Sequence, residues 1–168
     1  MVEDQQLPAW ESLSDYDRAW DSFESIYSFK PAFDGERAIE EPLGSITFGL
    51  VSRPFNRWPT WTVHAVNALV VAGMAELLEP DEPLIVLDWQ HPAYRFWPQR
   101  AGLYDREGAF PHGVFPWPDG DYYAFLNADM TQGTFGHPWA ETICVFGDRL
   151  TPLLSPHLEL LLPVVRRG

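Results

Sequence analysis

The sequence contains a single cysteine, Cys144, so the chain can form no internal disulfide bond. Chains without disulfides are typical of reducing compartments, and we therefore expect a cytoplasmic protein. Cys144 lies within the apolar run TICVFG, where a small buried side chain is expected rather than a nucleophile.

Secretory and membrane-spanning patterns are also missing. The opening residues, MVEDQQLPAW, lack the basic start and the apolar stretch of a secretory signal. The longest apolar run, VNALVVAGMAELL, is too short to span a membrane and contains Asn67 and Glu76. We therefore expect no membrane partner, with a flexible tail over residues 1–9 and one domain over residues 10–168.

Positive charge is scarce. The chain carries 11 Lys and Arg against 24 Asp and Glu, a net charge of −13. Between Met1 and Glu41 there are eleven acidic and three basic residues. Such a surface repels the phosphates of nucleic acids, which argues against a nucleic-acid partner, and it attracts basic proteins. A surface that serves only solubility explains the same charge.

Familiar catalytic signatures are absent: the sequence has no P-loop, no GxGxxG after a strand, no HExxH, no CxxC and no GxSxG. We therefore expect no cofactor. His91, His137, Asp121 and Glu141 could be nominated as metal ligands, but their spacing does not require a site, and we predict no metal.

What the chain does have is amphipathic helices. SDYDRAWDSFESIY predicts a helix over residues 14–28, with Ser14 as its cap. Its aromatic residues recur every three or four positions and form one stripe: Tyr16, Trp20, Phe23 and Tyr27. A second helix is expected from Thr60 or Thr62 through Leu78. A short third helix is expected in DRLTPLL, with Asp148 as a possible cap.

Four apolar runs predict strands of one sheet, over residues 45–51, 84–88, 121–127 and 141–146. TQGTFGHPW is expected to connect the last two, and RPFNRWPTW and residues 98–120 are expected to be loops. The predicted fold is α+β, a single compact domain with a mostly antiparallel sheet and with the helices 14–28 and 62–78 packed on one face.

Polar and aromatic residues gather at the ends of three predicted strands, in DWQHP, DGDYY and GHPWAE. A proline after each of two histidines holds their backbone extended, which fixes the direction of a side chain. The candidate catalytic residues are His137, His91, Asp121 and Glu141, because a histidine oriented by a carboxylate can transfer protons. The candidate ligand-binding residues are Asp88, Trp89, Gln90, Arg95, Tyr122 and Trp139.

Each candidate also has a structural interpretation. His137 and His91 could serve as rigid corners, and Arg95 could be a surface arginine lying over an aromatic ring. Asp119-Gly120 is favoured as a hairpin turn.

Several stretches, in this order, resemble a bacterial family, the domain-of-unknown-function family 2716. The matching residues are LDWQHPAYRFWP, FPWPDGDYYAFLNAD and GTFGHPWAETICVFG, together with YDRAWDSF, FKP and GSITFGL. The resemblance covers about residues 10–154 and implies a small stand-alone bacterial protein. It supplies no catalytic residues.

Two functions are compatible with these features. The favoured one is a binding or inhibitor protein, similar to an immunity protein, that recognises a basic partner. The alternative is a small cofactor-independent enzyme with an aromatic-lined pocket for a small aromatic or apolar ligand, using His/Asp acid–base chemistry. Convergence of His91, His137 and Asp121 around one deep cavity would favour the enzyme, whereas a space filled by Trp89, Trp117 and Trp139 would favour binding. The substrate, the partner and the oligomeric state do not follow from the sequence.

Overall fold

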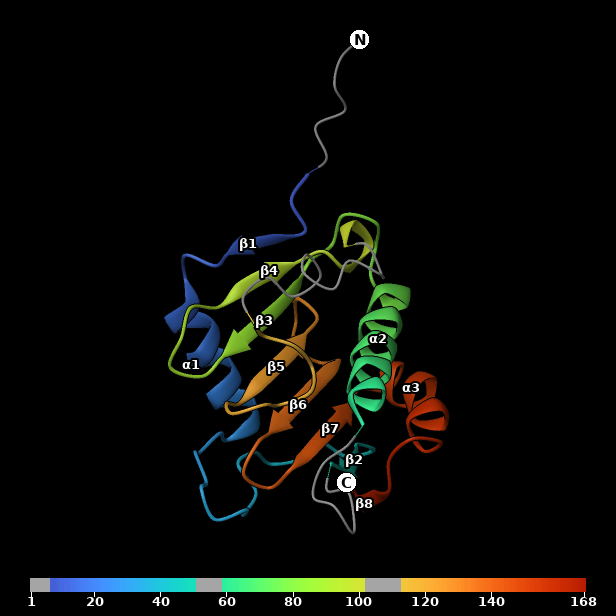
Figure 1. Ribbon diagram of the computed structural model, residues 1–168. Helices are drawn as coiled ribbons and strands as arrows, with labels where there is room; N and C mark the ends of the chain where they lie inside the picture. The colour runs from blue at the N-terminus through green and yellow to red at the C-terminus, as the bar shows by residue number, and fades with distance from the viewer. Residues whose placement is uncertain (1–6, 51–58, 102–112) are drawn as a thin grey trace.

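The computed structural model describes residues 7–50, 59–101 and 113–168 (Figure 1). Its strands are β1 (Trp10–Ser12), β2 (Ile46–Gly49), β3 (Leu84–Asp88), β4 (Tyr94–Phe96), β5 (Tyr123–Leu126), β6 (Gly133–His137), β7 (Thr142–Phe146) and β8 (Val164–Arg167). Its helices are α1 (Tyr16–Tyr27), α2 (Thr60–Leu77) and α3 (Leu150–Leu158), and a 3₁₀ turn lies at Pro98–Arg100. Most of the predicted tail, most of the loop RPFNRWPTW and the middle of the loop 98–120 lie outside the described residues.

Within the described residues the strands form one sheet in the order β1-β4-β3-β5-β6-β7-β2-β8. Every neighbouring pair is antiparallel. The four predicted strands correspond to β2, β3, β5 and β7, so the predicted α+β fold with a mostly antiparallel sheet is confirmed. The prediction of TQGTFGHPW as a connection is wrong, because most of this stretch forms β6 between β5 and β7.

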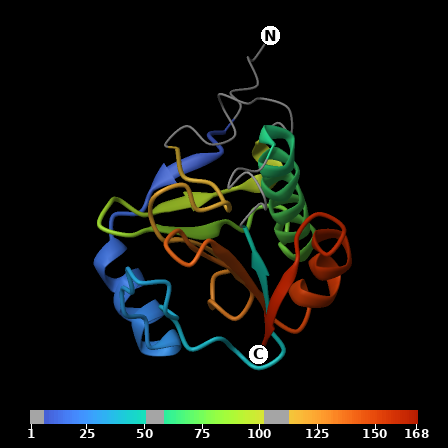
Figure 2. The same cartoon turned by 60° about the horizontal axis from the view of Figure 1, so that its bottom comes forward.

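Both faces of this sheet are covered. Alternate residues of β5 enter two different hydrophobic cores: Tyr123 and Phe125 pack with α2 and α3, whereas Ala124 and Leu126 pack with α1. Figures 1 and 2 show α1 on one side of the sheet and α2 with α3 on the other. The prediction that both long helices share one face is therefore wrong. The central strands are apolar at nearly every position, a pattern that requires cover on both faces.

α1 presents a different stripe to the sheet from the one its aromatic residues predict. Phe23 and Tyr27 are buried as expected, but Tyr16 is 42% exposed and Ala19 is buried in its place. These buried residues lie four positions apart and share one side of the helix. Asp15 is the N-cap and makes no side-chain capping bond, so the predicted Ser14 cap is wrong.

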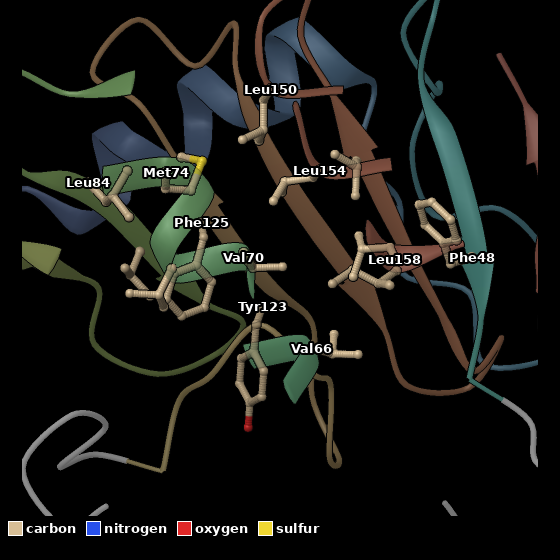
Figure 3. Packing of buried hydrophobic residues seen from close by; sticks show 14 of the residues in the cluster. Phe48, Val66, Val70, Met74, Leu84, Tyr123, Phe125, Leu150, Leu154 and Leu158 are labelled. Carbon is tan, nitrogen blue, oxygen red and sulfur yellow. The ribbon is translucent and has the colours of Figure 1, made fainter. Parts of the chain in front are cut away.

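α2 and α3 build the core on the other face. Figure 3 shows this core, with these residues labelled: Phe48, Val66, Val70, Met74, Leu84, Tyr123, Phe125, Leu150, Leu154 and Leu158. The two helices approach closely at Gly73, where a Cβ atom would lie 2.4 Å from Cδ2 of Leu154. No helix in the described part of the chain combines the length and apolarity needed to cross a membrane.

α3 extends further than DRLTPLL predicts, because Leu150–Leu158 continues through Ser155 and Pro156. Asp148 does not cap it. The backbone N–H groups of Arg149 and Leu150 instead donate to Oε1 of Gln132, at 3.2 and 2.9 Å. A side chain from the β5–β6 turn therefore caps a helix that follows it in the chain.

Candidate functional site

Strand pairing brings the three predicted polar clusters to one edge of the sheet. Asp88, at the end of β3, lies opposite Tyr123 at the start of β5. Tyr123 in turn lies opposite Gly136, which immediately precedes His137 at the end of β6. β3 and β6 run in the same direction with β5 antiparallel between them, so both of their C-terminal ends reach this edge.

Asp88, His91 and Asp121 converge at this edge, and we name them the Asp–His–Asp cluster. Nδ1 of His91 lies 3.1 Å from Oδ1 of Asp88 and 3.3 Å from Oδ2 of Asp121. Gln90 has a left-handed backbone, with φ of 66°, and the N–H of His91 donates to the carbonyl of Asp88. This tight turn folds the side chain of His91 back toward Asp88 at the end of β3.

The surroundings shift the pKa values of all three groups. Hydrogen bonding to Asp88 raises the pKa of His91. Burial raises the pKa of Asp88 despite that bond, and the negative charges of Asp121 and Asp119 act in the same direction. Burial also raises the pKa of Asp121. The side chain of His91 is 58% exposed and those of Asp88 and Asp121 are 10% and 16% exposed, so solvent screens the histidine far more than the carboxylates.

His137 is not part of this cluster. Its Nε2 lies 2.8 Å from the carbonyl oxygen of Glu36, and its Nδ1 accepts a hydrogen bond from the N–H of Ala140. These two partners require a neutral ring with the proton on Nε2. Burial lowers the pKa of His137, which agrees with that assignment. Both nitrogens are therefore engaged in holding the backbone.

Aromatic rings fill the space beside His137. The buried ring of Tyr122 lies 4.8 Å from that of His137 and 5.0 Å from that of Trp139, measured between centroids. Trp89 packs against Tyr122 at 5.5 Å. The hydroxyl of Tyr122 donates to the carbonyl of Ala32 and accepts from the N–H of the same residue. Tyr122 thus ties the loop after α1 to the sheet.

The remaining candidates lie apart from the Asp–His–Asp cluster or show no contact with it. Arg95 is in β4, exposed, with Nη1 3.8 Å from the carboxylate of Glu11 on β1. Gln90 is exposed in the turn that follows β3. Glu141 is exposed, with a left-handed φ of 50°, and its carbonyl accepts the N–H of Leu50. The four residues nominated as metal ligands are therefore not gathered around one point, because His137 is fully engaged elsewhere.

A cavity of about 530 Å³ lies between the start of α2 and the turns at this end of the sheet. It is lined by Leu50, Thr60, Val63, Trp117, Pro118, Asp119, Gly120, Pro138, Trp139 and Glu141. Tryptophan and proline walls with two carboxylates suit a small apolar ligand with a polar end. The lining includes Trp117, Trp139 and Glu141 but neither His91 nor His137. The arrangement therefore matches neither expectation fully: His91 meets Asp121 outside this cavity, and two of the three named tryptophans line the cavity without filling it.

Two residues of this edge were missed as site residues. Tyr123, on the opposite face of β5 from Tyr122, donates its hydroxyl proton to Oδ1 of Asp119 at 2.9 Å. Burial and this bond raise the pKa of Tyr123. Asp119 was interpreted as a turn residue, and its DGDYY context gives no sign that a strand tyrosine would reach it.

Cys144 is buried, as the sequence predicts, and burial raises the pKa of its thiol to about 12. At neutral pH it is therefore a neutral thiol without nucleophilic character.

Comparison with known proteins supports the resemblance noted in the sequence. The family described as "Protein of unknown function (DUF2716)" matches residues 12–151. The chain is also 30% identical over 146 residues to the uncharacterized protein YxiI of Bacillus subtilis (strain 168), covering 84% of this chain and 89% of the relative. No solved structure gives a significant match. Because the family match spans most of the chain, this protein belongs to the DUF2716 family of proteins of unknown function.

Proposed function

We propose that this protein binds a basic protein partner through an acidic surface on α1, in the manner of an inhibitor or immunity protein. The observation that carries the proposal is the placement of Asp17, Asp21 and Glu24, which we name the α1 acidic stripe. They are spaced four and three positions apart and all are exposed, so they lie along one side of the helix.

The surroundings of the α1 acidic stripe resemble a protein interface. Asp34, Glu36 and Glu40 in the loop that follows α1 are also exposed. Large hydrophobic side chains are exposed in the same segment, with Tyr16 at 42% and Phe33 at 60%. Interfaces combine such anchors with charges that are complementary to those of the partner. A basic partner would gain both association rate and contact area from this surface.

The proposal is tested with the basic proteins encoded beside its gene, each measured for association with the purified chain at increasing salt. We expect at least one to bind with an association rate that falls roughly tenfold or more between low and high salt, because steering by charge is screened. At low salt, the double variant Asp21→Lys/Glu24→Lys should associate more slowly than the wild type.

A matched control is Glu76→Lys/Glu79→Lys. These residues are also three positions apart and exposed, but Glu76 is in the last turn of α2 and Glu79 lies just after it, on the other side of the sheet. The control should leave association nearly unchanged. Equal loss in both double variants, binding that ignores salt, or no binding across the panel would contradict the proposal.

A second candidate function is acid–base catalysis, favoured by the contact of His91 with two carboxylates. Such an imidazole is held in one orientation and can exchange protons with a bound molecule. The wild-type chain should then hydrolyse at least one member of a panel of chromogenic esters and phosphate monoesters. His91→Asn should abolish that activity, and His157→Asn, at an exposed histidine of α3, should retain it. Inactivity on the whole panel, or activity that survives His91→Asn, excludes this candidate.

A further inference from the structure

We propose that Asp88, His91 and Asp121 bind a divalent transition-metal cation such as Mn²⁺ or Zn²⁺. One ligand atom from each residue lies within 4.8 Å of the other two. The three come from the end of β3, the turn that follows it and the position two residues before the start of β5. β3–β5 pairing therefore brings together donors that are 33 residues apart in the chain.

The separations from the imidazole nitrogen fit a coordination shell. Donor atoms that each lie about 2.1 Å from a metal are about 3.0 Å apart along an octahedral edge and about 3.4 Å apart along a tetrahedral edge. The imidazole Nδ1 lies 3.1 Å from one carboxylate oxygen and 3.3 Å from the other. The third separation, between the two carboxylates, is within 4.8 Å, so rotation of these side chains would bring all three donors to one cation.

The carboxylate of Asp121 is oriented before any ligand arrives. Its Oδ1 accepts the backbone N–H of Tyr122 at 2.8 Å, while Oδ2 is the atom that faces His91. Nearby, the hydroxyl of Tyr123 holds the carboxylate of Asp119. The bond to Asp121 fixes a proposed ligand from outside, as is typical of metal sites, whereas Asp119 is not a ligand and contributes only its negative charge.

Charge favours a cation at this position. Asp88 and Asp121 are mostly buried, and each experiences the negative charge of Asp119. A divalent cation would offset this repulsion more completely than the single charge of a protonated His91. Such a cation would also take the Nδ1 lone pair, so the imidazole could not act as a base through that atom.

The donor set selects among cations. Two carboxylate oxygens and one imidazole nitrogen suit Mn²⁺, Fe²⁺ or Zn²⁺, whereas Ca²⁺ and Mg²⁺ prefer oxygen ligands alone. His91 is 58% exposed, which leaves room for water in the remaining coordination positions. The three proposed ligands include no residue of the α1 acidic stripe, so either proposal can fail without the other.

The test is titration of the chelator-treated full chain with Mn²⁺ and, separately, with Zn²⁺, followed by calorimetry and, for Mn²⁺, by electron paramagnetic resonance. We expect one cation per chain and a rise in the thermal midpoint on binding. Asp121→Asn and His91→Asn should each weaken binding by roughly tenfold or more, since each removes a ligand. His157→Asn and Asp148→Asn, at exposed positions in and before α3, are the controls and should bind as the wild type does.

The alternative is that the same contacts form only an ion pair between a protonated His91 and its carboxylates. It predicts no saturable binding of either cation up to about millimolar concentrations, and that result would overturn the proposal. Binding of Mn²⁺ or Zn²⁺ that is unchanged in His91→Asn would overturn the proposal as well. The same holds if Ca²⁺ binds as tightly as Mn²⁺ or Zn²⁺ to the wild type and to His91→Asn. Unaltered far-ultraviolet circular dichroism and urea midpoints of the metal-free variants verify that each remains folded.

Discussion

Replacing Phe23 with alanine is expected to lower the free energy of unfolding by about 3–5 kcal/mol. Phe23 is fully buried on the inner side of α1. Its ring stacks on Phe135 of β6 at 5.7 Å and contacts Tyr27 at 4.9 Å and Trp20 at 5.6 Å, measured between centroids. Truncation would leave a cavity that these rigid rings cannot close, because they are fixed by further aromatic neighbours.

The comparison variant is Tyr16→Ala, in the same helix. Tyr16 is 42% exposed, so its truncation should cost about 1 kcal/mol or less. Urea unfolding followed by tryptophan fluorescence measures both variants. Equal losses of unfolding free energy would mean that α1 does not pack on the sheet through the side that carries Ala19, Phe23 and Tyr27.

Sequence patterns predicted the strands that are apolar on both faces and failed where glycine interrupted the pattern. TICVF is buried throughout, and its run of apolar residues marks β7 without ambiguity. β6 was missed because Gly133 and Gly136 suggested a loop. A Cβ on Gly133 would lie 2.4 Å from the carbonyl oxygen of Phe125, so this glycine permits close packing with β5 rather than a turn.

β1, β4 and β8 were missed for a different reason. β1 and β4 have three residues each, which is too short for a two-residue period to stand out. β8 has the sequence VVRR, in which two arginines leave no apolar run to mark a strand. Their place in the sheet depends on partners from distant parts of the chain: Trp10 lies opposite Phe96, and Ile46 opposite Arg167. Local sequence carries no record of such pairings.

In the candidate site, too, some contacts follow from sequence patterns and others do not. Asp88 and Asp121 are the last and the first residue of two predicted strands, so their meeting follows once β3 and β5 are paired. His91 joins them through a local turn. The partners of His137 could not be predicted, because one of them is the carbonyl of Glu36, 101 residues away on the loop after α1. A histidine before proline looks the same in sequence whether its ring faces a ligand or a backbone carbonyl.

His137→Ala is expected to lower the free energy of unfolding by about 2–4 kcal/mol at pH 7.5. The change removes a buried ring that packs against Tyr122. It also leaves the carbonyl of Glu36 and the N–H of Ala140 without their partner. His157→Ala, at an exposed histidine, is the control and should cost little.

The stabilising effect of His137 should depend on pH in a defined direction. Burial lowers its pKa in the folded chain, whereas in the unfolded chain the group titrates near its ordinary pKa of about 6.5. Below that pH the unfolded state binds the proton more readily, so stability falls as pH falls. The contribution of His137 to stability is complete above about pH 6.5 and is lost progressively as the pH drops toward the lowered pKa.

Urea unfolding at intervals from about pH 7.5 to 5.5 should therefore show the wild type losing stability faster than His137→Ala, since other titrating groups are common to both proteins. Parallel curves for the two would mean that His137 titrates as a solvated histidine, which its hydrogen bonds to Glu36 and Ala140 do not allow.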